Sequence, residues 1–129
     1  MATIIEGKVI HGDRIGRTLG FPTANISAED VAAEDGVYAS QVEVGARVYD
    51  AMSNLGRRPS VGGERRLLES HLFGFGGDLY GRDIRVRLLR RIRGEQHYPT
   101  VEALRKAIAR DAAAIKGMTE RHEPEPQNE

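Results

Sequence analysis

The segment Ile84-Arg85-Val86-Arg87-Leu88 alternates apolar and basic side chains. A period of two is typical of a β-strand with one buried and one solvated face, so the three apolar side chains point to a core. Working outward along the chain, further β-prone runs lie at residues 4–10, 37–44, 48–55 and 67–73. Gly45-Ala46, between two of these runs, suits a two-residue hairpin turn because glycine adopts the positive φ of its first position. The pattern predicts a mainly β domain.

The composition of the chain limits the number of domains and the kinds of partner and metal site to expect. The chain has 129 residues, enough for one domain with its own core, and fifteen glycines, which fit a fold with many turns. Nineteen basic and nineteen acidic residues give zero formal charge, so nothing global favours a polyanionic partner. With no cysteine, thiolate metal sites and disulfide scaffolds are excluded. The sequence carries neither a signal-peptide pattern nor an apolar run that could span a bilayer, so we expect a cytoplasmic protein.

The pattern becomes helical after Pro99. Thr100 is a good N-cap, Glu102 is an acid in the first turn, and apolar residues recur at helical spacing as far as Ile115. Gly117 supplies a C-terminal stop. We therefore expect one domain over residues 1–117, with a helix at about residues 100–116 that packs against the β part. The acidic, proline-bearing residues 118–129 are expected to be a disordered tail.

A glycine-rich segment is the first candidate for binding chemistry. Glycines recur every four residues at Gly12, Gly16 and Gly20, and Arg14 and Arg17 lie between them. Such spacing lets the backbone approach a ligand closely and direct N–H groups toward an anion. The alternative is a plain surface loop. A P-loop motif is absent, and the four histidines lack the spacing of a metal site.

Thr23 and Asn25 follow this segment, two positions apart on a stretch expected to be extended. Their side chains therefore point to the same side and offer a hydroxyl and an amide carbonyl. Both are hard oxygen ligands of the kind that Mg²⁺ accepts, and Mg²⁺ needs few protein ligands when nucleotide phosphates supply the rest.

Glu69 is a carboxylate within the otherwise apolar run Leu67-Leu68-Glu69-Ser70-His71-Leu72. With the period of a strand, Glu69 and His71 share a face with Leu67, while the other three residues take the opposite face. A carboxylate partly desolvated by leucines is one way to build a general base. The alternative is a salt bridge to one of the arginines.

Positive charge is concentrated in residues 57–93, where ten arginines stand against four acids. We interpret most of these arginines as a solvated strand face. A nucleic-acid-binding barrel is the alternative, although only three aromatic residues lie among the arginines to stack on bases.

Three blocks occur in the order and spacing of a known family. They are Gly16-Arg17-x-Leu19-Gly20-Phe21-Pro22-Thr23-Ala24-Asn25, Asn54-Leu55-Gly56-x-Arg58-Pro59-Ser60 and Leu68-Glu69-Ser70-His71-Leu72. Together with Asp78-Leu79-Tyr80-Gly81 and Ile92-Arg93-x-Glu95, they make the sequence resemble the riboflavin kinase (flavokinase) family over residues 6 to about 116.

The resemblance implies a six-stranded antiparallel Greek-key β-barrel with a C-terminal α-helix. It implies transfer of the γ-phosphoryl group of ATP to the ribityl 5′-hydroxyl of riboflavin, which gives FMN, with Mg²⁺ as the ion and Mn²⁺ or Zn²⁺ as alternatives. Glu69 would be the general base, and Thr23 and Asn25 would contact the metal and ATP. The remaining implied contacts are Gly12, Gly16, Arg17 and Gly20 to the phosphates, and Tyr80, Arg93 and Glu95 to the flavin.

Departures from the family pattern at Arg14-Ile15 and Gly74 suggest an alternative, a non-catalytic flavin- or nucleotide-binding module of the same fold. Many bacterial relatives carry an additional adenylyltransferase domain that makes FAD, and 129 residues leave no room for it, so we expect FMN as the product. The expected ligands are riboflavin or FMN and ATP or ADP. We expect a monomer, with neither nucleic acid nor a membrane as partner.

Overall fold

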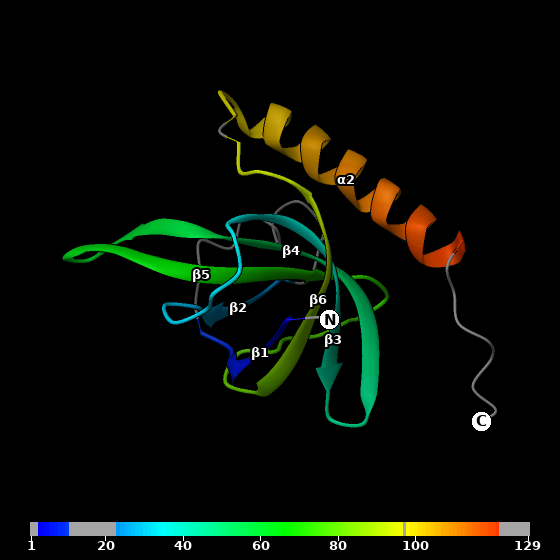
Figure 1. Cartoon of the computed structure of the whole chain (residues 1–129), viewed down its shortest axis with the longest axis horizontal. Helices are drawn as coiled ribbons and strands as arrows, with labels where there is room; N and C mark the ends of the chain where they lie inside the picture. Colours follow the sequence, from blue (N-terminus) through cyan, green and yellow to red (C-terminus); the bar gives the residue numbers. More distant parts are fainter. Residues whose placement is uncertain (1–2, 11–22, 97, 122–129) are drawn as a thin grey trace. The chain divides into compact units, whose positions relative to one another are not determined.

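The computed structural model describes residues 3–10, 23–96 and 98–121 (Figure 1). The chain forms two compact units, Met1–His97 and Tyr98–Glu129. Among the described residues, the first unit carries six antiparallel strands and the second carries one helix, so the expected mainly β class is confirmed. The elements are β1 (Thr3–Lys8), β2 (Thr23–Ser27), β3 (Gly36–Val44), β4 (Arg47–Ser60), β5 (Gly63–Leu72), β6 (Asp83–Arg93) and α2 (Val101–Arg121).

The strands form one sheet in the order β1-β6-β3-β4-β5-β2. Hairpins connect β3 to β4 and β4 to β5, and β2 lies beside β5, which is the strand order of a Greek key. The expected turn at Gly45-Ala46 is confirmed, because Val44 pairs with Arg47 and Gly45 has a φ of 61°.

The sheet curls into a half-barrel, which brings its two edge strands together (Figure 1). Just after β1, the backbone N–H of Ile10 donates to the carbonyl of Asn25 in β2 at 2.8 Å. Gly7 makes this approach possible, because a methyl group at Gly7 would lie only 3.3 Å from Cβ of Ile26. A side chain at Gly7 would therefore require Ile26 to give way by a few tenths of an ångström.

The interior of the half-barrel holds the main apolar core. On β6, Ile84, Val86 and Leu88 are buried in it while Arg85 and Arg87 are exposed, as the alternation predicts. On β5, Leu68 and Leu72 belong to this core, whereas the buried Leu67 does not. Successive β5 side chains therefore point alternately inside and outside the sheet.

Three serine hydroxyls form a hydrogen-bonded chain across the buried interior. The hydroxyl of Ser53 on β4 lies 2.7 Å from that of Ser40 on β3 and 2.7 Å from that of Ser70 on β5. All three residues are at most 2% exposed. Each hydroxyl therefore has a partner, which offsets the cost of burying it.

Arg66 on β5 fixes the connection between β2 and β3. Its guanidinium donates to the carboxylate of Asp35 at 2.8 Å and to the carbonyls of Val31 and Ala33 at 2.6 Å each. Its backbone N–H donates to the Glu29 carboxylate at 2.8 Å. One side chain thus satisfies several loop carbonyls and holds the end of β2 against β5.

In the second unit, helix α2 begins as the sequence predicts. Thr100 is the N-cap, since its hydroxyl accepts the backbone N–H of Ala103 at 3.0 Å. The expected stop at Gly117 is wrong, because α2 continues to Arg121. Glycine inside a helix costs only about 1 kcal/mol relative to alanine, which flanking residues can offset. Residues 118–121 are thus helical, and the rest of the expected tail, residues 122–129, lies outside the described residues.

That α2 packs against the β part stays a prediction. Within the described residues, no helix is both long and apolar enough to cross a membrane.

Candidate active site

Glu69 lies between two asparagines on neighbouring strands. In the antiparallel register, Glu69 on β5 faces Asn25 on β2 and also Asn54 on β4. Directly opposed residues of an antiparallel pair share a face of the sheet. The three side chains therefore form a row on the outer face, which we call the Asn25–Glu69–Asn54 row.

Two residues of the row are buried and the third, Asn54, is half-buried. Asn25 is 4% exposed and Glu69 is 8% exposed. Within the part of the chain that the structure describes, the buried Oδ1 atoms of Asn25 and Asn54 have no hydrogen-bond partner. Each such acceptor costs roughly 1–3 kcal/mol, so it is retained where a ligand supplies the missing partner. The row has the character of a binding site.

Thr23 and His71 extend the site along the same face. They oppose each other in the β2–β5 register, and the Thr23 hydroxyl lies 3.2 Å from Nδ1 of His71. Since Asn25 faces Glu69 two residues further along, Thr23 and Asn25 share a face, as predicted. The prediction that Glu69 and His71 share a face is confirmed as well.

Arg58 on β4 is the charged partner of Glu69. Its Nη2 donates to Oε1 of Glu69 at 3.1 Å, so the alternative of a salt bridge is also realised. Burial alone would lower the pKa of Arg58, but the charges and hydrogen bonds of Glu69 and Glu95 outweigh burial and raise this pKa above its ordinary value. A guanidinium this close favours the ionised carboxylate of Glu69.

The three expected flavin contacts lie in different places. Glu95, just beyond β6, accepts a hydrogen bond from Nη1 of Arg58 at 3.4 Å. Because Arg58 also donates to Glu69, it links the two carboxylates. Tyr80 lies on the β5–β6 loop, where the next residue, Gly81, donates its N–H to the Val9 carbonyl. Arg93 ends β6 and bonds the nearby Gly94 carbonyl at 2.9 Å. The flavin roles of these three residues stay predictions.

Comparison with known proteins identifies the family. A family model described as riboflavin kinase (flavokinase) matches residues 2–119. The chain belongs to the riboflavin kinase family. The bifunctional riboflavin kinase/FMN adenylyltransferase of Escherichia coli (strain K12) is 46% identical to it over 109 residues, which cover 83% of this chain and 35% of that relative. The chain thus spans about a third of the length of this relative.

Solved structures agree with the riboflavin kinase fold. A crystal structure titled macrolide-efflux protein from Streptococcus pneumoniae superposes with a TM-score of 0.79 at 33% identity, over 89% of this chain and 38% of that one. Riboflavin kinase from Trypanosoma brucei gives a TM-score of 0.62 over 92% of this chain and 80% of that one. At 23% identity the second likeness speaks for the fold alone.

The expected phosphate contacts of this riboflavin kinase family member lie outside the described residues. They are Gly12, Gly16, Arg17 and Gly20. Thr23 and Asn25, at the start of β2, are the first described residues of the same block.

The row offers oxygen donors that fit Mg²⁺. Asn25 presents a buried carbonyl oxygen without a partner, and Thr23 presents a hydroxyl on the same face. Across residues 3–10, 23–96 and 98–121, no three or more His, Cys, Asp or Glu side chains are grouped to hold a metal. An ion at Thr23 and Asn25 would therefore take its other ligands from phosphates and water.

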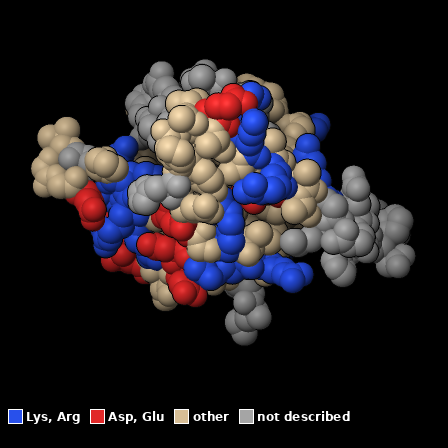
Figure 2. Space-filling view, turned by 90° about the horizontal axis from the view of Figure 1, so that it is seen from above, with Lys and Arg blue, Asp and Glu red and all other residues tan. Residues whose placement is uncertain are grey.

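The arginine-rich region is largely the solvated face that the sequence predicts. Arg85, Arg87, Arg90 and Arg91 of β6 are exposed. Acids from other segments pair with two of them, Glu6 with Arg85 at 2.6 Å and Glu34 with Arg91 at 3.7 Å. Acidic side chains accordingly lie among the basic ones in Figure 2.

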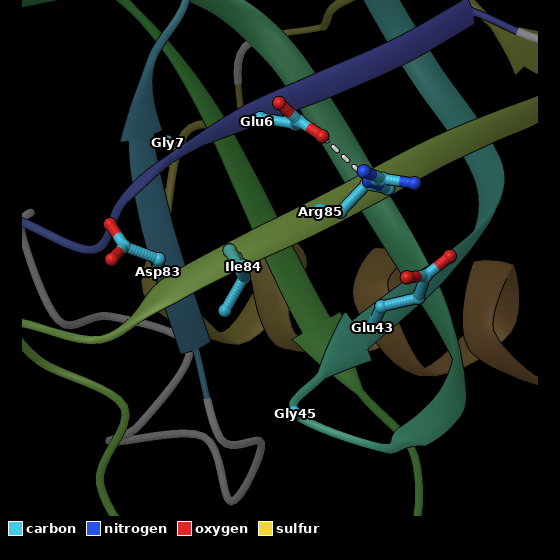
Figure 3. A pocket seen from close by; sticks show the side chains of 7 residues that line it. All are labelled: Glu6, Gly7, Glu43, Gly45, Asp83, Ile84 and Arg85. Atoms are coloured by element: carbon cyan, nitrogen blue, oxygen red, sulfur yellow. Dashed lines mark hydrogen bonds and ion pairs between the residues drawn. The ribbon is translucent and has the colours of Figure 1, made fainter.

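A surface cavity of about 500 Å³ lies on a different part of the barrel (Figure 3). Its lining comes from β1, β6 and the β3–β4 hairpin, and the Glu6–Arg85 pair lies within it. None of the predicted site residues that the structure describes lines this cavity. Buried acceptors without partners mark the Asn25–Glu69–Asn54 row as the better candidate.

Sequence reasoning did not single out Asn54 and Arg58 as site residues. The signal was present, because both lie in the block Asn54-Leu55-Gly56-x-Arg58 that carries the family resemblance. With the period of a strand, residues 54, 56 and 58 share a face. Only the β4–β5 register reveals that this face is the one that carries Glu69.

Proposed function

We propose that the chain is a riboflavin kinase that transfers the γ-phosphoryl group of ATP to the 5′-hydroxyl of riboflavin and releases FMN. The observation that carries the proposal is the Asn25–Glu69–Asn54 row, in which a carboxylate lies between two buried amide oxygens that have no partner among the described residues. Phosphoryl transfer needs positioning and charge stabilisation more than covalent chemistry, and such a row can supply both.

Glu69 orients the alcohol and accepts its proton. A primary alcohol is too weakly acidic to ionise beforehand, so the carboxylate acts as the phosphoryl group is transferred. Nη2 of Arg58 donates to this carboxylate at 3.1 Å, and a guanidinium beside a carboxylate favours its ionised form. The carboxylate can therefore accept a proton from the substrate.

Thr23 and Asn25 hold Mg²⁺ on the β2 side of Glu69. When bound, Mg²⁺ neutralises negative charge on the ATP phosphates. The ion would give the Asn25 Oδ1 atom the partner that it lacks among the described residues.

Asn54 lies on the other side of Glu69. Neighbouring strands are about 4.8 Å apart, so Asn25 and Asn54, two strands apart, are separated by roughly 10 Å. Mg²⁺ binds oxygens at about 2.1 Å, so one ion does not reach both side chains. We therefore place Asn54 on the alcohol side, where its Oδ1 accepts a hydroxyl hydrogen of riboflavin.

Incubation of the chain with riboflavin, ATP and Mg²⁺, followed by chromatography of the flavins, tests the proposal. FMN without FAD is expected. Folded protein that binds riboflavin and forms no FMN would instead support the non-catalytic flavin-binding alternative. The same assay with Mn²⁺ or Zn²⁺ ranks the ions. The monomeric state and the cytoplasmic location stay predictions.

A further inference from the structure

Arg58 is shared between two carboxylates that are far apart in the sequence. Its Nη2 donates to Glu69 at 3.1 Å and its Nη1 donates to both oxygens of Glu95 at 3.4 Å. The side chains of Arg58, Glu69 and Glu95 are 21%, 10% and 33% exposed. These contacts are thus partly shielded from water, which strengthens them relative to surface pairs.

Gly56 creates the space in which Glu95 lies. A methyl group built at Gly56 would overlap Oε2 of Glu95 and would come within 2.9 Å of Nη1 of Arg58. Gly56 is not among the glycines with positive φ, so its backbone would accept another residue. Glycine at this position therefore serves the close approach of Glu95 and not a turn.

The Glu95 contact restricts how Arg58 can engage Glu69. A guanidinium opposite a single carboxylate commonly forms two parallel hydrogen bonds, which occupy both oxygens. Here Nη1 is held by the Arg57 carbonyl at 2.9 Å and by Glu95 at 3.4 Å, which leaves Nη2 to donate to Oε1 of Glu69. Without Glu95, Arg58 could rotate and engage both oxygens, and Glu69 would be less able to take a proton.

We propose that Glu95 is a positioning residue that acts through Arg58 to hold Glu69 in its productive orientation. This inference rests on the proposed kinase function and gives Glu95 a role other than the flavin contact implied by the family resemblance. Gly56 contributes to this positioning, because the absence of a side chain there leaves room for the Glu95 carboxylate.

Two variants remove the contact in different ways. Gly56→Ala displaces the end of the flexible Glu95 side chain, and Glu95→Gln keeps the shape but removes the charge. We expect each to lower kcat about 10- to 100-fold, the usual range when a reacting group is misplaced. KM for riboflavin and for Mg·ATP should change less than about twofold, because a positioning role requires no contact between either residue and a substrate.

Gly76→Ala is the matched control, because a methyl group at Gly76 meets nothing within 4 Å and φ is not positive there. It should leave kcat unchanged. The double variant Gly56→Ala/Glu95→Gln should be no slower than the slower single variant. In a Glu69→Gln background, Glu95→Gln should have no further effect, because the residue it positions is already gone.

The outcomes distinguish failure of the positioning role of Glu95 from failure of the proposed kinase function. FMN formation by the wild-type chain together with unchanged kcat in Glu95→Gln overturns this inference alone. A raised KM for riboflavin with unchanged kcat also overturns it and assigns Glu95 to the flavin. If the wild-type chain forms no FMN, the proposed function fails and the positioning role fails with it. If Gly56→Ala does not fold, Glu95→Gln and its double variant with Glu69→Gln decide.

Discussion

Two polar rows cross β4 and β5 at neighbouring positions, one on each face of the sheet. On the inner face, the hydroxyl of Ser53 on β4 lies 2.7 Å from that of Ser40 on β3 and 2.7 Å from that of Ser70 on β5. On the outer face, Glu69 lies between Asn25 and Asn54, whose buried Oδ1 atoms have no partner within residues 3–10, 23–96 and 98–121. Glu69 and Ser70 are adjacent residues, so local sequence does not explain the difference.

This contrast distinguishes buried polar groups that stabilise the fold from buried polar groups that are available to bind a ligand. A buried polar group is tolerated when a neighbour satisfies it, as in the serine row. A group left without a partner lowers stability, and such a cost is typical of functional sites. Substitutions in the two rows should therefore have opposite effects on stability and on activity.

The largest effect is expected from Glu69→Gln. The amide cannot accept the proton of the alcohol, so kcat should fall about 10²- to 10⁴-fold, the usual contribution of a general base. Steady-state FMN formation measures it, and circular dichroism confirms the fold. Glu64→Gln, an exposed change on the same strand, is the control and should keep the full rate. Full activity of Glu69→Gln would reduce Glu69 to a structural ion-pair partner of Arg58.

Asn25→Leu should separate stability from activity. Leucine has similar size and removes a buried acceptor without a partner, so the free energy of unfolding should rise by about 1 kcal/mol. The same change removes a proposed Mg²⁺ ligand, and metal-dependent activity should fall about 10- to 100-fold. Urea unfolding and an Mg²⁺ titration of the rate measure the two effects. A less stable protein with an unchanged Mg²⁺ requirement would contradict both assignments.

Ser53→Ala should do the reverse in the inner row. It removes the hydroxyl shared by Ser40 and Ser70, so the free energy of unfolding should fall by about 2 kcal/mol while kcat stays unchanged. Ser27→Ala, at an exposed position on β2, is the control and should shift stability by less than about 0.5 kcal/mol. A large fall in kcat without loss of stability would place the serine row in the catalytic machinery.

Much of the fold could be predicted because its signals are local. The alternation at residues 84–88, the Gly45-Ala46 turn and the Thr100 cap each depend on residues a few positions apart, and the structure confirms them. The prediction that the helix ends at Gly117 is wrong, since α2 continues to Arg121. A glycine within a helix costs only about 1 kcal/mol, so it does not by itself end the helix.

The site was predictable only in part, because its assembly depends on strand register. The strand period places Glu69 and His71 on one face, and the family resemblance points to Thr23 and Asn25. No local pattern reveals that Asn54 faces Glu69 across β4 and β5. The contact between Arg58 and Glu95 is likewise hidden from the sequence. It depends on where the segment that follows β6 lies relative to β4.

The smallest effect is expected from Asn54→Ala, which tests whether the two ends of the outer row differ. If Asn54 accepts one hydroxyl hydrogen of riboflavin, its loss should raise KM for riboflavin about fivefold, the equivalent of one neutral hydrogen bond of about 1 kcal/mol. The Mg²⁺ concentration that gives half-maximal rate should stay the same, because the ion lies on the β2 side of Glu69.

Thr23→Val is the matched variant at the opposite end, and it should raise the Mg²⁺ requirement while leaving KM for riboflavin unchanged. Initial rates over a grid of riboflavin and Mg²⁺ concentrations distinguish the two variants in one experiment. If both shift the same constant, the metal and the alcohol do not occupy opposite sides of Glu69. The two orphaned oxygens at Asn25 and Asn54 would then serve a single ligand that spans the row.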